Sequence, residues 1–145
     1  MTESRPSLRD EHVARLRAAG LRVTAPRLAV LNILQSGGHL TVEEITGRAR
    51  RRLGHVSQQA IYDVLHVLDR RGLVHRIQPM GHPTQYEART GDNHHHLVCR
   101  SCGAVSDVDC AVGEAPCLKA QDDHGYEIAE VEVLYWGVCS GCRTQ

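Results

Sequence analysis

The stretch SQQAIYDVLHVLDRRGLVHRIQPMGHPTQYEAR, residues 57–89, decides the fold of the first half of the chain. Four apolar residues in it share one helical face at i, i+3, i+4 and i+7 spacing: Ile61, Val64, Leu65 and Leu68. The predicted helix begins at Ser57, a favourable N-cap, and ends at Gly72. Residues 73–78 and 84–89 then have the pattern of strands, and PMGHP between them carries Gly and Pro turn signals. This helix and hairpin are expected to be a recognition helix and a wing.

Further helices are predicted before this stretch. LRDEHVARLRAAG has apolar residues at helical spacing. VTAPRLAVLNILQSGG can be capped by Thr24, with Pro26 in its first turn. LTVEEITGRARRRLG opens with Thr41 and Glu44 in capping-box spacing. Several short helices followed by a two-stranded hairpin predict a winged helix-turn-helix domain over residues 1–88.

The second half has a different pattern. Residues 89–93, RTGDN, are predicted to form a hinge. In residues 94–145, HLVCRSCGAVSDVD predicts two short strands, GEAPCLKAQDDHG a helix, and YEIAEVEVLYWGVC a longer strand. We expect a small α/β unit with an antiparallel sheet, so the whole chain is α+β. So small a unit has little core of its own and needs a metal, a partner subunit or both for stability.

Charge is divided unevenly along the chain. Residues 1–88 hold thirteen Arg against eight acidic residues, whereas residues 89–145 hold three Arg and one Lys against nine. The basic half indicates a polyanionic partner such as nucleic acid, although a dipolar surface without function has the same counts. We find no signal peptide and no apolar run long enough to span a bilayer, and therefore expect a cytoplasmic protein without a membrane partner.

Four of the six cysteines form two Cys-x-x-Cys knuckles: Cys99, Cys102, Cys139 and Cys142. Four thiolates satisfy Zn²⁺ tetrahedrally, so a structural zinc is predicted, and a closed four-sulfur site leaves no position for catalysis. Reduced free thiols or a redox pair are the alternatives. Cys110 and Cys117 lie outside the knuckles, and either are small buried side chains, which we favour, or form a redox pair.

The histidine-rich run GDNHHHLVCRSCG suggests a second metal site. His94 and His96 alternate along a predicted strand and therefore point to one side, while His95 points to the other. Asp107 and Asp109 alternate in the next strand and could add oxygen donors. Such a set suits Fe²⁺, Mn²⁺ or Zn²⁺, and the alternative is a group of solvated surface histidines.

The face of the predicted recognition helix opposite its apolar residues is polar. It carries Gln59, Tyr62, Asp63, His66 and Arg70, with Ser57 and Gln58 at the N-terminal end. Gln can pair with adenine in the major groove, and Tyr can contact a thymine methyl group or a phosphate. The alternative is a solvated helix face.

Taken together, LRVTAPRLAVL, SQQAIYDVLHVLDRRGLV, HHHLVCRSCG and YWGVCSGC resemble the ferric uptake regulator (Fur) family over nearly the whole chain. GDNHHHLVCRSCG, DVDCAVGEAPC and EVLYWGVC look most like its actinobacterial FurA/CatR branch, which is associated with catalase-peroxidase genes. The resemblance implies a homodimeric, metal-dependent repressor whose C-terminal domain, residues 94–145, dimerises and binds metal. It also implies that the repressor binds an operator of the kind typical of the family, an AT-rich inverted repeat, and that Arg27 lies near this DNA.

The family's regulatory site, carried over by motif, falls on His39, Glu87, His94, His96 and Asp107. The resemblance implies one Fe²⁺ or Mn²⁺ held by donors from both domains, so that occupancy favours the DNA-binding arrangement. In peroxide-sensing relatives an oxidised histidine ligand releases the metal, and His39 and His94 are the candidates here. Those relatives often carry Asp at the position of Glu87, so response to iron supply without peroxide sensing is the alternative. A metal-dependent enzyme with a small-molecule substrate is not expected, because no nucleophile motif or Gly-rich cofactor loop is present.

Overall fold

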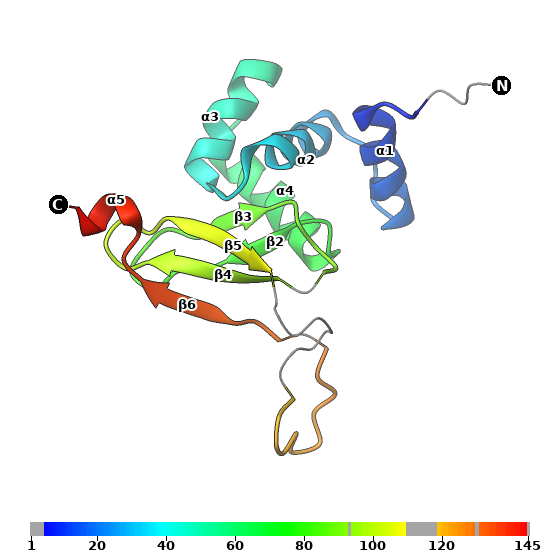
Figure 1. The fold of residues 1–145 in the computed structure, drawn as a ribbon. Coiled ribbons are helices and arrows are strands. Elements are labelled where there is room, and N and C mark those ends of the chain that lie inside the picture. The colour runs from blue at the N-terminus through cyan, green and yellow to red at the C-terminus, as the bar shows by residue number, and fades with distance from the viewer. Residues whose placement is uncertain (1–4, 93, 110–118, 130, 145) are drawn as a thin grey trace. The chain divides into compact units, whose positions relative to one another are not determined.

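The computed structural model describes residues 5–92, 94–109, 119–129 and 131–144 (Figure 1). The chain divides into two compact units. The first comprises Met1–Gln78 and Pro83–Thr90, and the second comprises Pro79–His82 and Gly91–Gln145. The predictions made for Cys110 and Cys117 lie outside the described residues.

The described part of the first unit contains four helices and a small sheet (Figure 1). The helices are α1 (Leu8–Ala18), α2 (Ala25–Gly37), α3 (Val42–Leu53) and α4 (Gln58–Arg70). The strands are β1 (Leu40–Thr41), β2 (His75–Ile77) and β3 (Gln85–Glu87), in the order β1-β3-β2 with antiparallel pairing throughout. Four helices ahead of a hairpin are the predicted winged helix-turn-helix arrangement.

Local capping explains where these helices begin. Thr24 caps α2 by accepting a hydrogen bond from the Arg27 N–H at 3.4 Å. Thr41 accepts from the Glu44 N–H at 3.3 Å, and the Glu44 carboxylate accepts from the Thr41 N–H at 2.8 Å, which completes the capping box of α3. Ser57 caps α4 in the same way as Thr24 caps α2. All three predicted helix starts are confirmed.

The core of the first unit is mainly aliphatic and includes the aromatic Tyr86. Its fully buried members include Leu16 of α1, Leu31 of α2 and Ile45 of α3. Helix α4 contributes three of the four predicted core residues, Ile61, Leu65 and Leu68, each with 0% exposure, and Val64 packs against the core partly buried. The apolar face predicted from spacing is therefore the face that α4 buries.

The wing contains a strand that the sequence did not indicate. Leu40 and Thr41 pair with Tyr86 and Gln85, so β1 adds a third strand to the predicted hairpin. A strand of two residues is too short to show an alternation of polar and apolar side chains, so the sequence did not predict it. Its pairing also joins segments that are far apart in the sequence. This pairing places His39, the residue before β1, next to Glu87 of β3.

The second unit is built on the strands β4 (His94–Cys99), β5 (Val105–Asp109) and β6 (Leu134–Gly137), in the order β5-β4-β6, followed by the short helix α5 (Ser140–Arg143). The expected antiparallel pairing is present between β4 and β5, whereas β6 runs parallel to β4, so the sheet is mixed. A parallel pair needs a crossover of a dozen or more residues. The connection from the end of β5 at Asp109 to Leu134 is long enough to supply it.

Two predicted elements of the second unit differ from the structure. The helix expected over residues 113–125 is absent from its described part, 119–125, where a turn is closed by a 2.9 Å bond from the Tyr126 N–H to the Asp123 carbonyl. The carboxylates of Asp122 and Asp123 each accept a backbone N–H two residues on, and such local bonds compete with a helix. Residues 113–118 lie outside the described part. The strand expected over residues 126–139 is limited to β6, because the length of its pairing with β4 sets its ends.

No helix in the described ranges has the length and apolar character needed to span a membrane.

Candidate metal centres and DNA-binding surface

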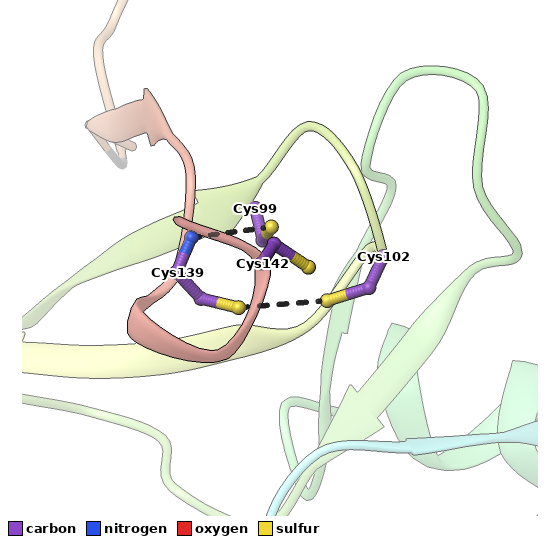
Figure 2. Close-up of side chains that lie close together, drawn as sticks. All are labelled: Cys99, Cys102, Cys139 and Cys142. Atoms are coloured by element: carbon purple, nitrogen blue, oxygen red, sulfur yellow. Dashed lines mark hydrogen bonds between the residues drawn. The ribbon is translucent and has the colours of Figure 1, made fainter. Parts of the chain in front are cut away.

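All four knuckle cysteines come together within the second unit. Their sulfur atoms lie within 4.8 Å of one another, and Figure 2 shows Cys99 and Cys102 facing Cys139 and Cys142. The Sγ atoms of Cys102 and Cys139 are 3.9 Å apart. A tetrahedral zinc with Zn–S bonds of about 2.3 Å requires sulfur atoms about 3.8 Å apart. The four side chains therefore have the chemistry and the spacing of a structural zinc site.

The local fold explains how each pair reaches the other. Cys99 ends β4, and the turn after it is closed by a 2.9 Å bond from the Gly103 N–H to the Cys99 carbonyl. Gly103 has a φ of +74°, a backbone conformation that glycine adopts without strain. Cys139 is the N-cap residue of α5, and its N–H donates to Cys99 Sγ at 3.3 Å. Because β6 pairs with β4, the second knuckle is delivered directly beside the first.

The electrostatics of the cluster favour a divalent cation. The Cys139 and Cys102 backbone N–H groups lower the pKa of the Cys99 thiol to about 6. In contrast, hydrogen bonds from Cys139 and Cys102 raise the pKa of the Cys142 thiol to about 12. Sulfur atoms this close cannot all ionise without a counter-charge. A zinc ion would supply that charge and keep all four as thiolates.

A histidine–carboxylate cluster lies in the first unit around Glu87, which is 2% exposed. His39 Nε2 is 2.9 Å from Glu87 Oε2, and His75 Nδ1 is 3.0 Å from Glu87 Oε1. His39 and Glu87 were both predicted site residues, and β1 and β3 bring them together. His75 was missed. Its position opposite Glu87 in the hairpin register is the signal that could have found it.

A second cluster lies on the β4–β5 pair of the second unit. The rings of His94 and His96 have their centroids 4.8 Å apart, on the side predicted from the alternation. Asp107, directly opposite His96 in the register, places Oδ1 3.4 Å from His96 Nε2 and 3.7 Å from His94 Nε2. Asp92 Oδ1 lies 2.6 Å from His94 Nδ1. Because its other nitrogen is held by Asp92, the His94 ring presents Nε2 toward Asp107.

Both clusters combine imidazole nitrogen with carboxylate oxygen, the donors that suit Fe²⁺, Mn²⁺ or Zn²⁺. Their central groups are withdrawn from water, since His96 is 1% exposed and Glu87 2%. Buried carboxylates and imidazoles are costly unless they are paired or coordinate a metal. His95 does not join the second cluster, and its ring makes an edge contact with Tyr135 at 6.4 Å between centroids.

The predicted DNA-binding residues of α4 are exposed along one side of the helix: Gln58, Gln59, Tyr62 and His66. Tyr62 is the largest of them and is 49% exposed. Gln59 Nε2 donates to the Asp63 carboxylate at 2.9 Å, so this acidic residue is bound by its own helix. The Ser57 hydroxyl accepts from the Ala60 N–H as the helix cap. Arg27 is in the first turn of α2, and its guanidinium donates to the Arg22 carbonyl at 2.7 Å.

A model of the ferric uptake regulator family matches residues 18–136 of this chain. The chain belongs to the ferric uptake regulator family. Transcriptional regulator FurA of Mycobacterium tuberculosis strain H37Rv is 55% identical over 132 residues, which cover 91% of this chain and 90% of the relative. Ferric uptake regulation protein 1 of Mycolicibacterium fortuitum is 56% identical over 121 residues, which cover 83% of this chain and 75% of the relative.

Solved structures of the family have the same fold. The Vibrio cholerae ferric uptake regulator is 29% identical with a TM-score of 0.70, and the match covers 88% of this chain and 98% of that one. The Pseudomonas aeruginosa ferric uptake regulator, solved with manganese, is 26% identical with a TM-score of 0.68, and the match covers 89% and 98%. The predicted α+β class and family are confirmed. The chain is a transcriptional regulator of the ferric uptake regulator family and not an enzyme.

Proposed function

We propose that this family member is a homodimeric repressor that binds its operator when a single Fe²⁺ or Mn²⁺ is held by His39, Glu87, His94, His96 and Asp107. The observation that carries the proposal is the pair of histidine–carboxylate clusters with Glu87 and His96 buried at their centres, one in each unit, on either side of the predicted hinge. Each cluster brings together only some of the five proposed ligands. An ion that binds both sets has higher affinity for one arrangement of the two units, and a ligand shifts an equilibrium through such a difference.

The proposed zinc has a different role. With four sulfur ligands it has no open coordination position, so it stabilises the fold of the second unit and does not respond to a signal. The described part of this unit has few buried apolar residues, among them Val98 and the ligand Cys99 itself. Binding energy at the Cys99–Cys142 cluster would therefore replace part of the missing hydrophobic core.

The proposed operator is an AT-rich inverted repeat read by α4 of each subunit. The exposed amides of Gln58 and Gln59 suit adenine, and Tyr62 and His66 continue the same side of the helix. Ser57 and Arg27 are proposed to contact the DNA backbone, Ser57 at the helix N-terminus and Arg27 through its charge. Gln59 would have to leave Asp63 to pair with a base.

We propose peroxide as the signal that ends repression in the iron-loaded protein. Transfer of one oxygen atom from H₂O₂ to a ligand imidazole, His39 or His94, leaves water and an oxidised ring that is a poorer donor. Loss of one donor weakens metal binding, and DNA affinity falls with it. A regulator that answers iron supply alone would have the same ligands without this oxidation.

The metal dependence is tested by fluorescence anisotropy with an operator selected from a random duplex pool by the Mn²⁺-loaded protein. We expect chelation that removes Mn²⁺ but retains zinc to lower operator affinity by roughly tenfold or more, the size of an ordinary coupling between sites. His96→Ala should bind the operator weakly with or without Mn²⁺. His124→Asn is the matched control, because His124 is 77% exposed and Asn tolerates its positive φ. Operator affinity that is unchanged by chelation would refute the proposal.

The signal is tested by brief peroxide treatment of the Fe²⁺-loaded and the Mn²⁺-loaded protein. Mass spectrometry should find one added oxygen atom on the peptide of His39 or His94 in the iron form only, together with loss of operator binding. Iron-loaded protein that keeps its histidines unmodified and its operator bound would favour the iron-supply alternative.

A further inference from the structure

A pocket of about 430 Å³ lies within the first unit, where α1, the start of α2 and the end of α3 meet. Its apolar lining comes from Val23, Leu28, Ala29 and Leu53. Its volume is within the range of ligand pockets, which are mostly apolar with a few well-placed polar groups. None of these residues belongs to the zinc cluster, to the histidine–carboxylate clusters or to the proposed DNA-binding set.

His12 is the unusual member of the lining. It is 3% exposed, and neither of its ring nitrogens has a hydrogen-bond partner within the part of the chain that the structure describes. A buried polar group without a partner costs free energy that the fold must offset. Burial, followed by the charge of Arg15, lowers the pKa of His12, which favours the neutral ring with one donor and one acceptor. A ligand oxygen in the pocket would satisfy the donor.

The rim of the same pocket is cationic. Arg9 lies one helical turn before His12 on α1, and Arg52 lies near the end of α3, and both side chains are exposed. With the Asn32 amide turned to accept, its oxygen accepts from Nη1 and Nη2 of Arg52, the latter at 3.0 Å, so this amide holds the Arg52 guanidinium at the rim. No acidic side chain is among the residues that line the pocket. The rim therefore favours an anion.

We propose that this pocket binds a small organic carboxylate. The apolar part of the ligand contacts Val23, Leu28 and Leu53. The carboxylate accepts hydrogen bonds from Arg9 or Arg52 at the rim and from His12 inside. Phosphate would meet the same cations but would leave the apolar lining exposed, so a carboxylate with an apolar body fits both parts of the pocket. This site is independent of the metal response proposed above.

Calorimetric titration of the full-length, zinc-loaded protein with benzoate tests the assignment, with benzyl alcohol as the uncharged probe of similar shape and inorganic phosphate as the anion without an apolar body. We expect benzoate to bind roughly tenfold or more tightly than either, since a hydrogen bond to a charged group contributes about a factor of ten. Arg52→Gln and Arg9→Gln should each weaken benzoate binding severalfold. His12→Gln should do the same, and the His12 ring signals in the NMR spectrum should shift on titration.

His55→Gln is the matched control, because His55 is an exposed histidine of the same unit outside the pocket, and it should bind benzoate like the unmodified protein. Arg9 and Arg52 are exposed, so their variants test the pocket even if His12→Gln fails to fold. Equal binding of benzoate and benzyl alcohol, benzoate binding unaffected by both arginine variants, or no binding of benzoate overturns the proposal. Phosphate binding as tight as benzoate overturns it too, and points to a DNA phosphate as the occupant.

Discussion

Replacing Leu65 by Ala should destabilise the first unit and leave the residues of α4 that we propose to contact DNA unchanged. Leu65 has 0% exposure in α4, a helix that packs against both α2 and α3. The substitution removes three carbon atoms from the core. At about 0.8 kcal/mol for each buried CH₂ group, the transfer term is about 2.4 kcal/mol, and the cavity that remains raises the total to about 3–5 kcal/mol.

Tyr62 on the other side of the same helix provides the contrast. It is 49% exposed, so Tyr62→Ala should lower the free energy of unfolding by less than about 1 kcal/mol. If α4 reads DNA as proposed, the same substitution lowers operator affinity. One helix thus yields a variant that loses stability and a variant that loses binding, according to which face is changed.

The free energies of unfolding of both variants are measured by urea denaturation, monitored by circular dichroism, and their Tm values by calorimetry. A loss of about 3 kcal/mol in a unit of this size lowers Tm by roughly 12–24 °C. Leu65→Met is the matched control, because it conserves volume and should cost less than about 1.5 kcal/mol. If Leu65→Ala lowers the free energy of unfolding by less than about 1 kcal/mol, α4 does not bury the face that contains Leu65. The same conclusion follows if Tyr62→Ala lowers the free energy of unfolding as much as Leu65→Ala does.

Three further predictions concern the caps, the zinc cluster and pH. Thr41→Ala should destabilise the first unit by about 1 kcal/mol, because it removes the acceptor for the Glu44 N–H, while Thr41→Ser should retain the cap in thermal unfolding. Cys102→Ser should lower the zinc-to-protein ratio found by elemental analysis, whereas Ser101→Ala next to it should leave zinc bound. Burial lowers the pKa of His12 below 6.5, so the unfolded chain takes up the proton more readily and stability falls as the pH drops through that value. Urea midpoints at about pH 7 and about pH 5 should therefore differ less in His12→Gln than in the unmodified protein.

Much of the site was visible in the sequence because its signals are local. The two knuckles place their sulfur pairs by spacing alone, and His94 and His96 share a side because strand residues alternate. The caps at Thr24, Thr41 and Ser57 depend on hydrogen bonds to residues three positions away, so the local sequence is enough to predict them.

The partners of these groups were decided by strand register. Asp107 meets His96 because β5 pairs with β4 in one register and not in the next, and a shift by one residue would turn Asp107 to the opposite face. His75 reaches Glu87 for the same reason in the wing. The sequence pattern predicted both strands of the hairpin but not their register, so sequence reasoning missed His75.

The sequence by itself determined the four helices of the first unit, the apolar face of α4, the cysteine knuckles and the family, since each depends on residues a few positions apart or on short motifs. Only the tertiary structure decided the parallel direction of β6, the added strand β1 and the enclosure of His12 between α1, α2 and α3. These features arise when segments distant along the chain compete for the same edge or surface. The outcome depends on the whole packed core and on chain connections, which local periodicity does not encode.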